Sequence, residues 1–186
     1  LTAAADDEAA ALLAEFLPPT PLQRSERLSA VTGAEVWLKR EDLQPVRSYK
    51  VRGAFTLIAG LTEEQRAKGV VAASAGNHAQ GVAFAGQRLG VRSRIYLPRN
   101  TPRQKRDRVA ALGGDMVEVI VTGEVYDDAA KAAATDAKRT GAVVVPAFNA
   151  VETMAGQGAV AVEILQQLGR APDVVTVPVG GGGLLG

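Results

Sequence analysis

Short runs of β-branched apolar residues alternate along this sequence with longer stretches of helical pattern. Runs of this length are typical of strands, and the longer stretches are typical of helices. The expected strands are 35–39, 69–73, 94–97, 116–121, 142–145 and 174–178. The expected helices are a short amphipathic one within 1–16, then 50–61, 77–89, 102–112, 126–139 and 151–168. Strands that alternate with helices predict an α/β fold with a mostly parallel sheet.

Several helix ends carry their own signals. Thr62 and Gln65 have the spacing of a capping box, in which each side chain satisfies a backbone N–H of the first turn. Pro102 suits the first turn of a helix, where its missing N–H costs nothing. Four glycines fall where helices should end and where a positive φ is favoured: Gly69, Gly90, Gly113 and Gly141.

Composition and net charge limit the classes of protein to which this sequence can belong. The chain has 186 residues, 47% hydrophobic and 22% charged, with a formal net charge of +1 and no cysteine. These values predict a soluble globular protein without disulfides or thiolate metal sites, and without a field that would attract nucleic acid. No apolar run approaches the ~20 residues of a membrane span, and residues 1–16 are acidic, unlike a signal peptide. We therefore expect a cytoplasmic protein that binds neither a membrane nor a metal.

A buried strand at 174–179 is expected to run into the glycine loop Gly180-Gly-Gly-Gly183-Leu-Leu-Gly186. Glycines let backbone N–H groups approach an anion closely, and a following helix start would add its positive end. The loop therefore predicts a phosphate site, with a tight turn that binds nothing as the alternative. Gly181, Gly183 and Gly186 also fit the G-x-G-x-x-G pattern of dinucleotide binders, which alone is a weak signal. Because the sequence stops where this helix should begin, we expect it to be the N-terminal part of a longer chain, truncated at its C-terminus.

The segment Ser48–Ala54 places Lys50 at a helix start, with Ser48 as the expected N-cap. The positive end of a helix lowers the pKa of an amine placed there, and burial acts in the same direction. A readily deprotonated lysine is what Schiff-base chemistry requires. The alternative is an ordinary solvated lysine, the commonest state of this residue.

The segment Ser74–Gly81 follows an expected strand and opens a helix. Its small residues let the backbone approach a flat ligand, and the Asn77 amide can bond a ring oxygen. His78 is the single histidine of the sequence. We interpret it as a structural hydrogen-bonding residue and not a catalytic base, since no carboxylate partner is evident near it.

Residues 98–108 contain five basic residues and one acidic residue. Nucleic-acid binding is one interpretation, but no aromatic residues interleave the charges as stacking platforms. A solvated helix face is favoured, given the nearly neutral chain.

Taken together, the three segments Ser48–Ala54, Ser74–Gly81 and Gly180–Leu184 resemble the cofactor-contacting segments of the threonine dehydratases (threonine ammonia-lyases). These belong to the tryptophan-synthase-β-like, fold type II enzymes that use pyridoxal 5'-phosphate (PLP). The resemblance covers nearly the whole chain after residue 18. It includes the further segments Thr20-Pro-Leu22, 37–43, 61–64 and 156–158. It implies a three-layer αβα catalytic domain in which 70–148 form a small lobe, and 1–69 and 149–186 form parts of a large one.

The resemblance also implies roles for individual residues. Lys50 would hold PLP as a Schiff base and later move the substrate Cα proton, and Asn77 would bond the 3-oxygen of the cofactor. The phosphate would be cradled by Gly180, Gly181, Gly182, Gly183 and Leu184. The substrate carboxylate pocket would be lined by Ser74, Ala75 and Gly76. The hydroxyl that meets the pyridine nitrogen in such enzymes would lie beyond Gly186.

The implied reaction converts L-threonine to 2-oxobutanoate and ammonia for isoleucine biosynthesis, and serine to pyruvate in the same way, in a homo-oligomer. Serine racemase or another fold type II enzyme is the alternative within the family. Racemases tend to carry serine at the position of Ala75, which favours the dehydratase. Outside enzyme chemistry, an inactive piece that binds phosphate ligands and a dinucleotide-binding module both stay open as interpretations.

Overall fold

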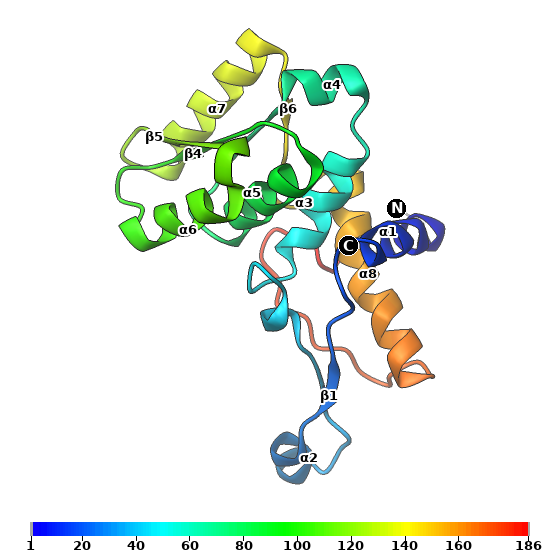
Figure 1. Ribbon diagram of the computed structural model, residues 1–186. Helices are drawn as coiled ribbons and strands as arrows, with labels where there is room; N and C mark the ends of the chain where they lie inside the picture. The colour runs from blue at the N-terminus through cyan, green and yellow to red at the C-terminus, as the bar shows by residue number, and fades with distance from the viewer. Residues whose placement is uncertain (1, 186) are drawn as a thin grey trace.

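The computed structural model describes residues 2–185, and its centre is a four-stranded parallel sheet with the order β5–β4–β3–β6 (Figure 1). The strands are β3 (Val70–Ala73), β4 (Ser93–Leu97), β5 (Val117–Val121) and β6 (Val143–Val144). β3 and β4 pair in the register Val70 with Ser93, and β4 and β5 in the register Ser93 with Val117. A strand, a helix and a neighbouring parallel strand therefore follow one another twice, as the alternating pattern predicts.

Helices supply most of the remaining structure. They are α1 (Ala3–Ala14), α2 (Glu26–Thr32), α3 (Lys50–Ala59), α4 (Glu63–Lys68), α5 (Asn77–Leu89), α6 (Arg103–Gly113), α7 (Tyr126–Thr140) and α8 (Val151–Leu168), with 3₁₀ turns η1 (Glu41–Leu43) and η2 (Gly114–Met116). A separate antiparallel pair, β1 (Leu22–Arg24) and β2 (Trp37–Lys39), carries α2 away from the body of the molecule (Figure 1).

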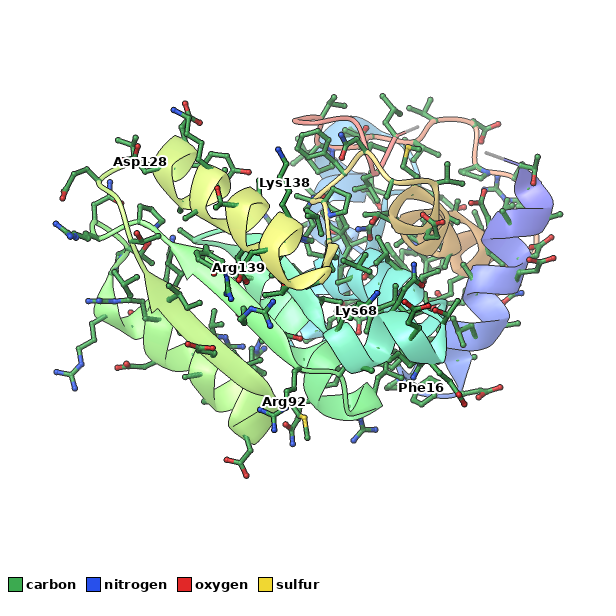
Figure 2. All side chains as sticks on the ribbon, turned by 90° about the horizontal axis from the view of Figure 1, so that it is seen from above. Phe16, Lys68, Arg92, Asp128, Lys138 and Arg139 are labelled. Atoms are coloured by element: carbon green, nitrogen blue, oxygen red, sulfur yellow. The ribbon has the colours of Figure 1, made fainter. Side chains whose placement is uncertain are left out.

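The alternation of side chains along β3 creates three layers. Val70 and Ala72 belong to the larger apolar cluster, with residues of α3 and α5. Val71 belongs to a second cluster with Ala129 and Ala133 of α7. Figure 2 shows α7 over this face of the sheet, with Asp128 near its first turn and Arg139 in its last. Because successive side chains of a strand point to opposite faces, helices cover both sides, and the predicted αβα fold is confirmed.

Glycines set how closely α3 packs between α5 and α8. A Cβ on Gly156 of α8 would lie 2.7 Å from the Cα of Gly53, and a Cβ on Gly81 of α5 would lie 2.9 Å from the carbonyl oxygen of Lys50. Any larger residue at these positions would force the helices apart. The first turn of α3, which contains Lys50, is therefore held closely between two helices.

Apart from the segment 174–178, the predicted helices and strands from residue 35 onward begin and end within two residues of those observed. Helices α5 and α8 have the predicted limits, and Thr62 and Gln65 form the capping box of α4. At the two ends of α6 the predicted roles are wrong. Gly113 is the last residue of α6, and Gly114 caps it with a φ of 48°. Pro102 is the N-cap of α6 and not a residue of its first turn. Gly69, Gly90 and Gly141 end their helices with positive φ, as predicted.

The predicted buried strand at 174–178 is wrong. This segment has no strand structure, and Val174, Val175 and Val179 are 81%, 59% and 63% exposed. A strand forms only beside another strand, and none of the described residues pairs with this segment. The apolar pattern alone therefore could not produce the strand.

The four-stranded sheet lies wholly within 70–148, the range predicted for the small lobe. The division into lobes itself stays a prediction. No helix in the described part of the chain has the length and apolar character needed to cross a membrane.

Candidate functional site

Lys50 is the first residue of α3, as the sequence predicts. Its amine is half-buried, and Nζ donates a hydrogen bond to the carbonyl oxygen of Ala147 at 2.7 Å. Within residues 2–185 no carboxylate pairs with it. Burial lowers the pKa of the Lys50 amine below its ordinary value, because the charged form loses hydration. A larger fraction of this amine is therefore neutral than in a solvated lysine.

The expected capping role of Ser48 is wrong. Tyr49 occupies the N-cap position of α3 with helical backbone angles (φ −62°, ψ −18°) and makes no side-chain cap bond. Ser48 lies one residue too early to reach the first turn, and its buried Oγ has no partner among the described residues. The start of α3 is thus uncapped.

Residues Ser74, Ala75 and Gly76 form a half-buried loop at the carboxyl end of β3, and Asn77 is the exposed first residue of α5. Ser74 Oγ accepts a hydrogen bond from the N–H of Gly76 at 3.2 Å. Ligands of open α/β sheets bind at the carboxyl ends of strands, where helix starts present free N–H groups. The loop therefore has the position of a binding loop.

His78 has a structural role, as predicted. It is 4% exposed, and its Nε2 lies 2.8 Å from the carbonyl oxygen of Val145. A carbonyl only accepts, so Nε2 carries the proton of this bond. Burial lowers the pKa of His78 to about 4, with a smaller contribution in the same direction from the charge of Lys50. The ring is neutral at pH 7 and fixes the chain that follows β6 against α5.

The segment Val145–Phe148 connects the predicted site residues, and sequence reasoning missed it. Its carbonyl groups accept from His78 and Lys50, and Phe148 packs against the glycine loop. A Cβ on Gly181 would lie 2.5 Å from the Phe148 ring, and one on Gly183 would lie 2.6 Å from the Phe148 carbonyl oxygen. The signal in the sequence was an aromatic residue four positions after the end of β6, in a chain with four phenylalanines.

The glycine loop is closed on one side by Phe148 and open on the other. A Cβ on Gly180 or Gly182 would meet nothing within 4 Å, and Gly182 has a φ of 87°. The N–H of Leu185 donates to the carbonyl oxygen of Gly182 at 2.9 Å, which closes a turn. Leu184 is half-buried within this turn, and Gly186 lies outside the described residues. No hydrogen bond joins the loop to Asn77 or to 74–76 within residues 2–185.

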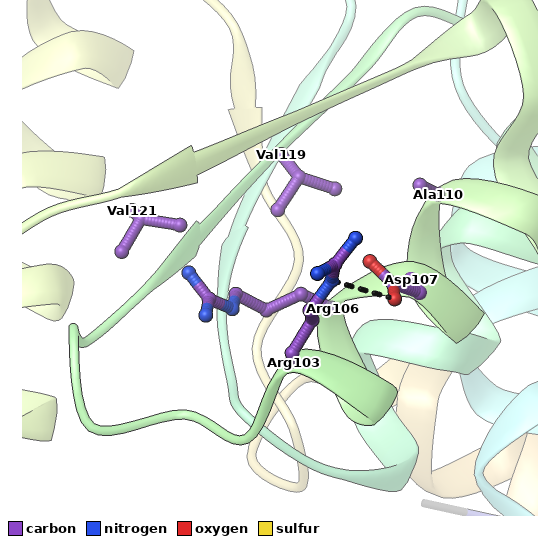
Figure 3. Close-up of a pocket in the computed structure, with 6 residues that line it drawn as sticks. All are labelled: Arg103, Arg106, Asp107, Ala110, Val119 and Val121. Atoms are coloured by element: carbon purple, nitrogen blue, oxygen red, sulfur yellow. Dashed lines mark ion pairs between the residues drawn. The ribbon is translucent and has the colours of Figure 1, made fainter.

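A cavity of about 290 Å³ lies elsewhere, between α6 and the edge strand β5 (Figure 3). It is lined by Arg103, Arg106, Asp107, Ala110, Val119 and Val121, and so by no predicted site residue. Arg103, Lys105 and Arg108 of α6 are exposed, and the Nε of Arg108 donates to Gln80 Oε1 at 2.7 Å. This agrees with the prediction of a solvated helix face. The described residues contain no group of three or more potential metal ligands.

Comparison with known proteins defines the class. Residues 13–186 match the family described as pyridoxal-phosphate dependent enzymes, and the chain therefore belongs to this family. It is 57% identical over 185 residues to the biosynthetic L-threonine dehydratase IlvA of Mycobacterium tuberculosis, and 57% identical over 189 residues to that of Corynebacterium glutamicum. Each match covers all of this chain and 43% of the relative. The chain therefore spans less than half the length of these two relatives.

Comparison with solved structures also finds PLP-enzyme relatives. The processed form of threonine deaminase isoform 2 from Solanum lycopersicum matches with a TM-score of 0.87 and 39% identity, over 99% of this chain and 51% of that one. Maize serine racemase matches with a TM-score of 0.91 and 35% identity, over 98% of this chain and 54% of that one. The predicted relationship to PLP enzymes is thus confirmed.

The residues present fit PLP, the cofactor of this family. The Lys50 amine is half-buried, has a lowered pKa and is held only by a backbone carbonyl. The outer side of the glycine loop leaves backbone groups free of Cβ atoms, as an approaching phosphate requires. Asn77 presents an exposed amide at a helix start.

Proposed function

We propose that this chain is the cofactor-binding part of a threonine dehydratase, which converts L-threonine to 2-oxobutanoate and ammonia in isoleucine biosynthesis. L-Serine would give pyruvate by the same route. The observation that carries this proposal is the 57% identity, over the whole chain, to proteins named as biosynthetic L-threonine dehydratases.

In this proposal Lys50 holds PLP covalently, and Asn77 bonds its ring oxygen. The phosphate is held by Gly180, Gly181, Gly182, Gly183 and Leu184. PLP, when bound, supplies an electron sink that makes the substrate Cα proton acidic. The open side of the glycine loop and the position of the Lys50 amine support these assignments.

Lys50 would act as the base of the elimination. Its lowered pKa increases the fraction of neutral amine, which can take the Cα proton at Nζ. The carbonyl of Ala147 accepts a hydrogen bond from this amine and so orients it. A backbone carbonyl is not a base, so it does not compete with Nζ for the Cα proton. The β-hydroxyl would leave as water with the proton taken at Nζ, and the free aminocrotonate would then react with water to give 2-oxobutanoate and ammonia.

The loop Ser74–Gly76 would bind the substrate carboxylate. It lies where β3 ends and α5 begins, and the free N–H groups of a helix start attract anions. This placement would hold the Cα of the substrate at one fixed position relative to the Lys50 amine.

Serine racemase is the second candidate, favoured by the structural match to the maize enzyme. Racemisation requires a second proton-transferring group on the opposite face of the substrate. Ala75 carries no such group, and His78 is neutral and already bonded to Val145. These two residues favour the dehydratase.

We also propose that the protein acts in the cytoplasm as a homo-oligomer, without a nucleic-acid or membrane partner. The family resemblance supports the oligomer. Light scattering coupled to gel filtration of the full-length native protein tests it, and a monomer at micromolar concentration would contradict it.

Borohydride reduction with near-stoichiometric PLP tests the cofactor assignment. We expect a single pyridoxyl group on Lys50 in peptide mapping, and none after Lys50→Ala. Lys68→Ala is the control, since this exposed lysine pairs with Glu64 on the surface of α4. The full-length protein should then release 2-oxobutanoate from L-threonine. Labels scattered over surface lysines, or interconversion of serine enantiomers without 2-oxo acid from either substrate, would contradict the proposal.

A further inference from the structure

A buried ionic cluster lies behind the first turn of α3. Arg52 is 1% exposed. Its guanidinium donates to both carboxylate oxygens of Glu41, at 2.8 Å each, and to both of Glu163, at 2.7 and 2.9 Å. Two bidentate pairs on one planar group leave it little freedom to rotate or shift. Arg52 is therefore fixed between η1 and α8.

The cluster continues to two further residues. Lys39 pairs with Glu163 and donates to the carbonyl oxygen of Thr20 at 2.7 Å, and the Thr20 hydroxyl donates to Glu41. Its two basic and two acidic groups balance, so no net charge is buried. Thr20, Lys39 and Glu41 come from the segments 20–22 and 37–43, which the resemblance singled out without giving them a role.

The start of α3 has no local anchor. Neither Ser48 nor Tyr49 caps it, and the chain enters through Arg47, whose φ of 62° is the sole positive value among the described non-glycine residues. The first N–H groups of a helix lack intrahelical partners, so an uncapped turn opens readily unless tertiary contacts hold it. Arg52 provides such contacts two residues after Lys50.

We infer that Arg52 is a positioning residue for Lys50: clamped between Glu41 and Glu163, it holds the first turn of α3 so that the Lys50 amine faces Ala147. The inference rests on the proposed function, because it takes Lys50 as the cofactor lysine. Residues two positions apart in a helix point in different directions. Arg52 therefore acts through the backbone and does not touch the amine.

The test needs variants that keep the cluster neutral. Arg52→Met alone would bury two carboxylates with one partner, and the protein could unfold. The double variant Arg52→Met with Glu41→Gln leaves Lys39 and Glu163 paired. Arg52→Lys keeps the charge but lacks the planar fork. Arg40→Met is the matched control, since Arg40 lies directly after β2, beside Glu41, and forms a surface bidentate pair with Asp42.

The measurements are made on the full-length native protein. PLP affinity and the pH midpoint of the bound cofactor's visible absorbance are measured beside the midpoint of urea unfolding. We expect the double variant to unfold at the wild-type urea concentration, yet to bind PLP about tenfold more weakly, with a shifted pH midpoint. Arg52→Lys should have a PLP affinity and a pH midpoint between those of the wild type and the double variant. Arg40→Met should have the wild-type values.

Two results would overturn the inference. One is a folded double variant with the affinity and pH midpoint of the wild type. The other is a loss of binding that follows the loss of folded protein in every Arg52 variant, including Arg52→Lys. Failure of the proposed function is seen separately, since wild-type protein would then carry no pyridoxyl label on Lys50 after reduction.

Discussion

The Lys50 amine shows how one residue acquires a chemical role from neighbours that are distant in the sequence. Its Nζ bonds the carbonyl of Ala147, and the adjacent residue, Phe148, supports the glycine loop. Burial from these packed segments lowers the pKa of the amine. The chemistry proposed for Lys50 thus depends on where the segment after β6 lies.

At the same scale, the lowered pKa of His78 predicts that the protein becomes less stable in acid. Its pKa is about 4 in the folded protein and ordinarily 6.5, so the unfolded chain binds the additional proton as the pH falls between these values. The contribution of the neutral His78 ring to the free energy of unfolding is complete above pH 6.5. It is lost as the pH falls toward 4, by up to about 3 kcal/mol.

His78→Gln keeps a donor for Val145 but does not titrate. We expect the difference in unfolding free energy between wild type and this variant to shrink or reverse from pH 7 to pH 4.5, measured by urea denaturation. Subtracting the unfolding free energy of the variant from that of the wild type removes the contribution of the carboxylates that titrate near pH 4. A difference that stays constant with pH would show that His78 has the same pKa in the folded and the unfolded protein, and would contradict the prediction.

At the scale of elements, the crossing of α3 with α5 depends on Gly81. A Cβ at this position would meet the Lys50 carbonyl at 2.9 Å, so Gly81→Ala must move the backbone that carries Lys50. We expect a loss of about 1–3 kcal/mol in unfolding free energy, together with weaker PLP binding.

Gly60→Ala is the control for this prediction. Its Cβ would meet nothing nearer than 3.6 Å, and its φ of −76° suits alanine. This variant should bind PLP normally and be unchanged, or more stable by about 0.4–1 kcal/mol, because alanine restricts the unfolded chain. Urea denaturation and PLP titration check both variants, and equal behaviour of the two would contradict a close crossing.

At the scale of the whole molecule, the segment after α8 exposes apolar side chains. Val174 and Val179 are 81% and 63% exposed, close to the exposed Val175. Contiguous exposed apolar surface favours association. We expect the purified 186-residue chain to self-associate as its concentration rises, and the double variant Val174→Ser with Val179→Ser to do so less.

These two substitutions should leave the unfolding free energy within about 0.5 kcal/mol of the parent, since exposed positions bury little surface. Val31→Ser serves as the control, because Val31 is 79% exposed on α2, away from this segment. Sedimentation velocity over a range of concentrations makes the measurement. Unchanged association in the double variant, or an equal effect of Val31→Ser, would contradict the prediction.

Local signals in the sequence determined the longer helices, the strands of the four-stranded sheet and the identities of the candidate residues, but neither β1 nor α2. The limits of α5 and α8 and the capping box of Thr62 and Gln65 were predictable, because they depend on residues within one or two turns of each other. Lys50 at a helix start was predictable for the same reason.

Tertiary structure alone decided the rest. Residues 174–178 have a strand pattern but no strand to pair with among the described residues, and Ser48 lies one position too early to cap α3. The meeting of Lys50, His78 and the glycine loop on the segment 145–148 needed the packing of β6 beside β3. The pairing of Arg52 with Glu163 likewise needed α3 to cross α8. Contacts between residues so far apart along the chain depend on how its elements pack, which no local pattern records.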